Sequence, residues 1–171
     1  MNLEEIETEG GQSSAIKVRV LLRLAARNQR NGLGPPYFTK LRRFSLKLHN
    51  TDGGLPLQSC ALEIKSILEL RISSFIDNNL LQHHLTHFIP SWDHEYTATS
   101  LSMPRCQLDS ELLRTFLYRF HSLRSFEYLH LKDFYSTSNR HLCMVPEKVK
   151  EGLDPSKTSF EKLILLHESG P

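Results

Sequence analysis

The residues most suggestive of chemistry form a short histidine cluster, His83-His84-Leu-Thr-His87. On a helix, His83 and His87 would share one face because they lie four residues apart, and this spacing suits two imidazole ligands of a metal ion. The glutamate of the H-E-x-x-H metalloprotease signature is absent, and nearby carboxylates could complete a site only through tertiary placement. We therefore interpret these histidines as structural or surface residues, and predict no metal site and no cofactor. If the protein were instead a metal-dependent hydrolase that uses His83 and His87, elemental analysis would find a stoichiometric amount of metal.

Motifs of other enzyme classes are also missing. The sequence has no G-x-S-x-G nucleophile motif, and Cys60, Cys106 and Cys143 form neither a C-x-x-C pair nor a zinc-type spacing. Gly32-Leu-Gly34 is followed by prolines, which block the loop-to-helix transition of a phosphate-binding loop. We predict that the chain is not an enzyme and that its cysteines are buried, reduced thiols.

Length and composition indicate one folded domain. The chain has 171 residues, 39% hydrophobic and 23% charged, which suits a globular domain. Residues 1–13 are expected to form a disordered acidic lead, and residues 14–171 a single leucine-rich-repeat-like domain. No apolar run approaches the roughly 18 residues of a membrane span, and the acidic opening does not resemble a secretory signal. We expect a cytoplasmic or nuclear protein that does not enter a membrane.

Five segments share the apolar spacing of leucine-rich repeats, L-x-x-L-x-L-x-x-N/C-x-L. They are Leu41-x-x-Phe44-x-Leu46, Ile67-x-x-Leu70-x-Ile72, Ala98-x-x-Leu101-x-Met103-x-x-Cys106-x-Leu108, Leu123-x-x-Phe126-x-Tyr128 and Phe160-x-x-Leu163-x-Leu165. The third has Cys106 at the Asn or Cys position, which lies in the turn that leaves the strand. Successive segments start 26, 31, 25 and 37 residues apart. Regular repeats are about 20 to 29 residues long, so two of these are expanded.

Helical patterns lie between several of these segments. The clearest runs from Asp109, a suitable N-cap, to Phe120, and its leucines and phenylalanines form one apolar stripe. Further helices are expected at about 15–28, 79–88 and 146–152. The fold class is therefore α/β, a short irregular leucine-rich-repeat-like solenoid with about five parallel strands alternating with helices or loops. With no cap in sight after the last strand, a partner covering that end or a truncated product is expected.

Two groups of residues are candidates for binding. Polar residues between the apolar strand positions should point to the outer face of the strands, and the aliphatic Ile164 belongs to the same row: Ser45, Lys47, Arg71, Ser102, Glu127 and Ile164. Trp92 and Tyr96 lie in the long insertion before the third segment. Aromatic residues in an exposed loop on a rigid scaffold are frequent interaction hot spots. The sequence thus predicts a non-catalytic module that binds an unidentified protein partner.

The chain resembles the divergent leucine-rich-repeat region of fungal F-box and F-box-like proteins. The resemblance rests on residues 33–46, 99–113 and 120–128, and spans about residues 15–168. It implies substrate recognition for a ubiquitin ligase, with a separate F-box that recruits a Skp1-type adaptor. Only Leu55-Pro56 and the following residues are remotely like the start of an F-box, and they lie between two repeat segments. An adaptor would therefore bind only if an F-box is supplied elsewhere.

A basic segment leaves one alternative open. Between Ile16 and Leu48 the chain has no acidic residue and nine basic ones: Lys17, Arg19, Arg23, Arg27, Arg30, Lys40, Arg42, Arg43 and Lys47. Such a block can bind nucleic acid, and it can equally be a solvated surface. No nucleic-acid-binding motif accompanies it, so the solvated surface is favoured. A nucleic-acid-associated protein using Lys17 to Lys47 is the alternative function.

Overall fold

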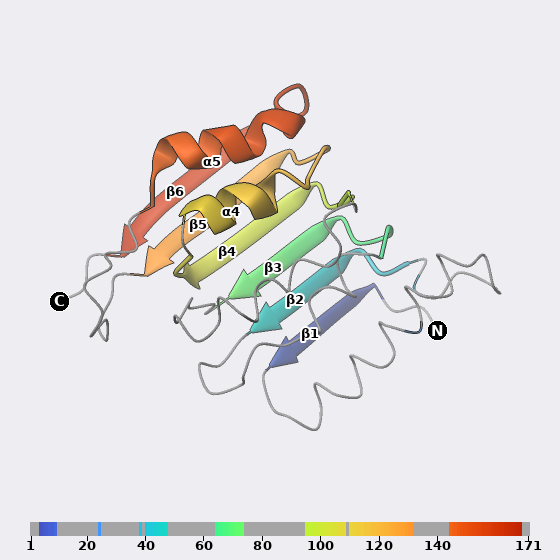
Figure 1. Ribbon diagram of the computed structural model, residues 1–171. Coiled ribbons are helices and arrows are strands. Elements are labelled where there is room, and N and C mark those ends of the chain that lie inside the picture. The colour runs from blue at the N-terminus through green and yellow to red at the C-terminus, as the bar shows by residue number, and fades with distance from the viewer. Residues whose placement is uncertain are drawn as a thin grey trace.

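The computed structural model describes residues 4–9, 24, 38, 40–47, 64–73, 95–108, 110–131 and 144–168. These residues form an α/β structure with one six-stranded sheet, all parallel, in the order β1-β2-β3-β4-β5-β6 (Figure 1). The strands are β1 (Glu5–Glu9), β2 (Arg43–Lys47), β3 (Glu69–Ser73), β4 (Ser100–Cys106), β5 (Ser125–Leu131) and β6 (Lys162–Glu168). Helices α4 (Ser110–Leu117) and α5 (Pro146–Leu153) lie over one face of the sheet, and the short helix η1 (Asp154–Ser156) follows α5.

The five apolar segments form strands β2 to β6, which confirms the parallel α/β class. Each strand begins two residues after the first apolar position of its segment, at residues 43, 69, 100, 125 and 162. The expected helices near 109–120 and 146–152 correspond to α4 and α5. The helices expected at 15–28 and 79–88 lie outside the described residues, except for Leu24.

The acidic start of the chain contains a strand that the sequence analysis did not predict. Residues 1–13 were expected to be disordered, but Glu5–Glu9 form β1, which pairs in parallel with β2. The pairing aligns Ile6 with Phe44 and Thr8 with Leu46, and Ile6 packs against the core. In the sequence, Leu3-x-x-Ile6-x-Thr8 is a weak copy of the repeat pattern with a polar third position. The sheet therefore has six strands where about five were predicted.

The same backbone connection repeats at every step of the sheet. The N–H groups of Arg42 and Arg43 both donate to the carbonyl of Glu4, at 2.8 and 3.1 Å. Equivalent paired bonds lead from residues 68 and 69 to Arg42, from 99 and 100 to Leu68, from 124 and 125 to Thr99, and from 161 and 162 to Arg124. These carbonyls occupy equivalent positions, each just before a strand, so every strand is joined to the next by the same pair of hydrogen bonds.

The apolar side chains lie in rows that cross the strands on the face below the helices. One row consists of Phe44, Leu70, Leu101 and Phe126, which are paired in register and buried. Another forms just before the strands, from Leu41, Ile67, Ala98 and Leu123, also buried. Side chains alternate between the two faces of a strand, so each segment places its apolar residues on this one face. Stacking of the segments thus produces one continuous core.

Two side chains form hydrogen bonds with backbone groups inside this core. The buried Cys106 Sγ donates to the carbonyl of Ile72 at 3.3 Å, so the residue at the Asn or Cys position joins one repeat to the previous one. The N–H of Leu108 donates to the hydroxyl of the buried Tyr128 at 3.1 Å. Buried polar groups cost free energy unless they are hydrogen-bonded, so these contacts help to fix the turn after β4.

Candidate functional site

The predicted polar strand residues lie on the sheet face opposite α4 and α5, which we call the open face. The register aligns Ser45 with Arg71, Arg71 with Ser102, Ser102 with Glu127, and Glu127 with Ile164. Glu7 of β1 extends this row, because it pairs with Ser45. Residues predicted from five separate segments therefore lie side by side across the whole sheet, and we call them the central row.

Two further rows flank the central row. Lys47, the other predicted strand residue, is aligned with Glu9 and Ser73, one row closer to the ends of the strands. The row near the strand starts was missed by the sequence analysis, and it contains Glu5, Arg43, Glu69, Ser100, Ser125 and Lys162. Its signal was present in the sequence, because each of these residues lies two positions before a central-row residue and strand alternation puts them on one face.

Hydrogen bonds between strands connect side chains within these rows. Arg43 Nε lies 2.8 Å from Glu69 Oε2, and both side chains are more than half exposed. Ser102 Oγ donates to Glu127 Oε2 at 3.0 Å, and Ser125 Oγ donates to Ser100 Oγ at 2.9 Å. An exposed ion pair stabilises a fold by only about 0 to 1 kcal/mol, so the chief effect of these contacts is to orient the side chains.

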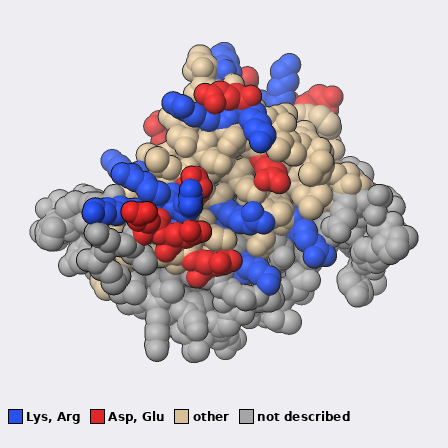
Figure 2. Space-filling model, turned by 180° about the vertical axis from the view of Figure 1, so that it is seen from behind, with Lys and Arg blue, Asp and Glu red and all other residues tan. Residues whose placement is uncertain are grey.

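The open face changes in character from β1 to β6. On β1 to β3 the charges alternate in the row near the strand starts, with Glu5 beside Arg43 and Arg43 beside Glu69, and Arg71 adds a basic residue in the central row. On β4 and β5, Ser100, Ser102 and Ser125 form a hydroxyl-rich centre. Leu129 of β5 and the aligned Leu166 of β6, together with Ile164, form an apolar part of the face. Figure 2 shows this side of the molecule, where basic and acidic side chains are intermingled and a largely uncharged area lies beside them.

The predicted loop aromatics are not both in a position to bind. Tyr96 was expected in an exposed loop, but this expectation is wrong, because the side chain is buried with 3% of its surface exposed. Its ring packs against Phe116 and Phe120 of the helix segment, with centroids 6.1 and 5.1 Å away. The Tyr96 N–H also donates to the carbonyl of Arg119 at 2.9 Å, which fixes the residue in the core. Trp92 lies outside the described residues.

A cluster of ion pairs lies in the helix layer and was not predicted. Glu111 of α4 accepts hydrogen bonds from Arg114 Nε at 2.6 Å and interacts with Lys148 Nζ of α5 at 2.8 Å. Lys148 also contacts Glu151 at 3.2 Å. The contact with Lys148, followed by that with Arg114, lowers the pKa of the Glu111 carboxyl, and the contact with Glu111 raises the pKa of Lys148. This cluster joins α4 to α5 on the side of the sheet opposite the open face.

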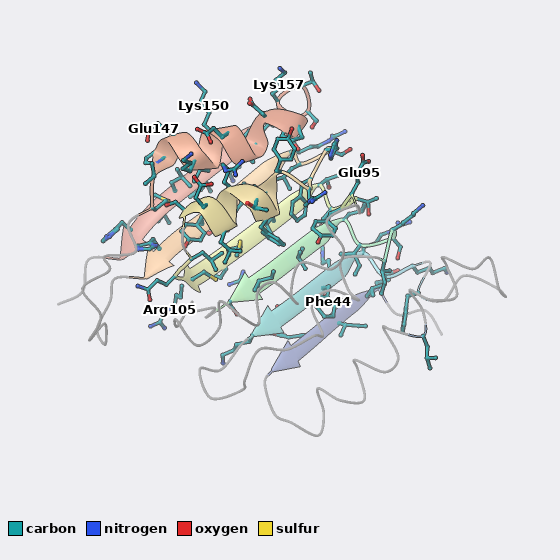
Figure 3. All side chains as sticks on the ribbon, viewed as in Figure 1. Phe44, Glu95, Arg105, Glu147, Lys150 and Lys157 are labelled. Carbon is teal, nitrogen blue, oxygen red and sulfur yellow. The ribbon has the colours of Figure 1, made fainter. Side chains whose placement is uncertain are left out.

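The outer surface of α5 is charged. Figure 3 shows Glu147 and Lys150 on the side of α5 that points away from the sheet, and both residues are exposed. Arg105 lies at the other side of the molecule from Lys157, near the carboxyl end of β4, where it adopts a positive φ of 55°. The helix layer is thus a solvated surface that can serve as a reference for tests of the open face.

Groups that could take part in chemistry are few in the part of the chain that the structure describes. The described residues contain no group of three or more His, Cys, Asp or Glu that could hold a metal ion. His83 and His87 are outside this part of the chain, so the prediction about them stays a prediction. The thiol of Cys106 is buried and hydrogen-bonded. The open face presents hydroxyl, carboxylate and guanidinium groups in regular rows.

Among the described residues, no helix is both long enough and apolar enough to cross a membrane. The chain was also compared with known proteins. It matches no protein-family model, and neither a curated protein nor a solved structure shows significant similarity to it.

Proposed function

We propose that the chain is a short leucine-rich-repeat-like solenoid and that it acts as a non-catalytic protein-interaction module. The observation that carries this proposal is the central row, in which Ser45, Arg71, Ser102 and Glu127 lie side by side across four neighbouring strands. Repeat proteins present such rows as extended binding surfaces, because each unit adds one strand to the same face. The repeated backbone bonds at Glu4, Arg42, Leu68, Thr99 and Arg124 support the solenoid part of the proposal.

The sequence of charges on the open face suits an extended polypeptide partner. A segment lying across the strands would pass the alternating charges of β1 to β3, the serine-rich centre and the apolar β6 in turn. We propose that such a segment bonds to Arg71 and Glu127 and packs an apolar residue near Ile164. The resemblance to fungal F-box proteins adds a biological context, in which the partner would be a substrate of a ubiquitin ligase.

Affinity capture from native cells, followed by mass spectrometry, tests this function. The bait is the whole chain, compared with an Arg71→Glu variant of the central row and with a Lys150→Glu variant on the outer side of α5. We expect Arg71→Glu to lose specific partners that the Lys150→Glu control retains. Recovery of a Skp1-type adaptor would support the F-box context. Identical sets of captured proteins for all three baits would contradict binding at the open face.

The alternative nucleic-acid function is less well supported by the open face. Of the basic segment, Arg43 and Lys47 lie on β2, and acidic residues flank Arg43 on both sides, Glu5 on β1 and Glu69 on β3. Nucleic-acid binding by phosphate contacts weakens steeply as salt rises. Measurement of binding to DNA and RNA at low salt would detect it, and failure to bind under these conditions would remove the alternative.

A further inference from the structure

Strand β6 has large apolar residues on both of its faces, and two of them are exposed. Leu163 continues the buried row of Phe44, Leu70, Leu101 and Phe126, but it is 46% exposed, whereas these four are exposed by 4% or less. On the open face, Ile164 lies beside Glu127 of β5 and Leu166 lies beside Leu129, and Leu166 is 49% exposed. A strand that is apolar on both faces is typical of the interior of a sheet.

The outer edge of β6 also carries backbone groups that can take another strand. No strand among the described residues pairs with this edge. The N–H of Lys162 donates to Arg124 at 2.9 Å, so the backbone groups of Lys162 face β5. Because these groups alternate along a strand, those of Leu163, Leu165 and His167 face outward. An exposed apolar edge of this kind promotes pairing with another chain.

The sequence of β6, Lys-Leu-Ile-Leu-Leu-His-Glu, is complementary to itself in the antiparallel direction. With Leu165 opposite Leu165 of a second copy, Lys162 falls opposite Glu168 and Ile164 opposite Leu166. In the same alignment Leu163 falls opposite His167, so all outward backbone groups meet as hydrogen-bonded pairs. The oppositely charged residues then form non-hydrogen-bonded pairs, in which side chains approach most closely.

We propose that the chain forms a symmetric dimer through antiparallel pairing of β6 with β6 of a second copy. A two-fold axis perpendicular to the sheet passes between the two Leu165 residues, so the two helix layers lie on one side and the two open faces on the other. Two Lys162–Glu168 pairs flank a centre of isoleucine and leucine. Two-fold dimers are the most common oligomers, and their interfaces are self-complementary in this manner.

Analytical ultracentrifugation of the whole chain, across a dilution series in the micromolar range, tests the dimer. We expect a reversible monomer–dimer equilibrium for the wild type. Lys162→Glu and Glu168→Lys each place like charges opposite each other at two sites, so each should weaken association by about tenfold. The double variant restores opposite charges and should regain the wild-type affinity. A monomeric wild type, unchanged single variants or an unrestored double variant would each overturn the proposal.

A second pair of variants tests the edge independently of charge. His167→Pro removes an outward N–H without removing a bond to β5, and should abolish the dimer. His167→Ala keeps that N–H and should still dimerise. Far-UV circular dichroism shows that each variant has folded. Symmetric pairing of β6 with β6 stops at two copies, whereas head-to-tail pairing of β6 with a different edge can continue to add copies. Species larger than a dimer at high protein concentration would therefore contradict the proposal.

Discussion

Single buried side chains hold neighbouring segments together, and Ser156 is the clearest example. Its hydroxyl accepts from the N–H of Leu123 at 3.1 Å and donates to the carbonyl of Phe120, and the residue is fully buried. One side chain after α5 thus satisfies two backbone groups in the loop before β5. This contact could not be predicted from the sequence, because nothing in the spacing shows which loops lie next to each other.

Replacement of Ser156 by alanine would leave two buried backbone groups without this partner. We expect the free energy of unfolding to fall by about 1 to 3 kcal/mol. Chemical denaturation monitored by circular dichroism measures the change. Ser122→Ala is the matched control, because Ser122 is exposed and directly precedes Leu123. Surface substitutions of this kind usually change stability by less than about 0.5 kcal/mol. Equal effects of the two substitutions would contradict the role assigned to Ser156.

At the scale of the elements, the sequence predicted strands better than it predicted contacts. The apolar spacing located β2 to β6, because alternation along a strand is a local property that requires a buried face. Strand β1 was missed, since Thr8 stands where an apolar residue was expected and four of the six residues from Glu4 to Glu9 are acidic. Tyr96 was misplaced for a related reason. Its burial depends on Phe116 and Phe120, which are distant in sequence.

The contact between α4 and α5 depends on Gly152. A Cβ atom added there would lie 2.9 Å from both the Arg114 carbonyl oxygen and Leu117 Cβ. We expect Gly152→Ala to destabilise the protein by about 1 to 3 kcal/mol, although alanine favours a helix, because α5 must move away from α4. Thermal denaturation measures the effect. Lys150→Ala is a control on the exposed side of the same helix, and it should leave the stability nearly unchanged.

The ion pairs between α4 and α5 make stability depend on pH. The pKa of Glu111 is lowered in the folded state, so its contribution is present above the ordinary value of 4.5 and is lost as the pH falls through the lowered pKa. The pKa of Lys148 is raised, so its contribution is lost as the pH rises through that value, above 10.5. We expect Glu111→Gln to reduce the difference in melting temperature between neutral and acidic pH. An unchanged difference would contradict the effect of this cluster.

At the scale of the whole molecule, the two faces of the sheet differ. Segments that repeat one pattern place their apolar side chains below the helices and their polar side chains on the open face, so stability and binding use opposite sides of the same strands. The residues of the central row were predictable, because they follow from the alternation of side chains along the strand in each segment. Its continuity across strands was not, because it depends on the register between segments whose spacings differ.

Site-specific photo-crosslinking in native cells tests the central claim most directly. A photoreactive amino acid is placed at position 71 in the middle of the central row, or at position 150 on the outer side of α5. The account predicts discrete crosslinked products with another protein from position 71, and none of the same products from position 150. Products that form equally from both positions, or only from position 150, would contradict a protein-binding role for the open face.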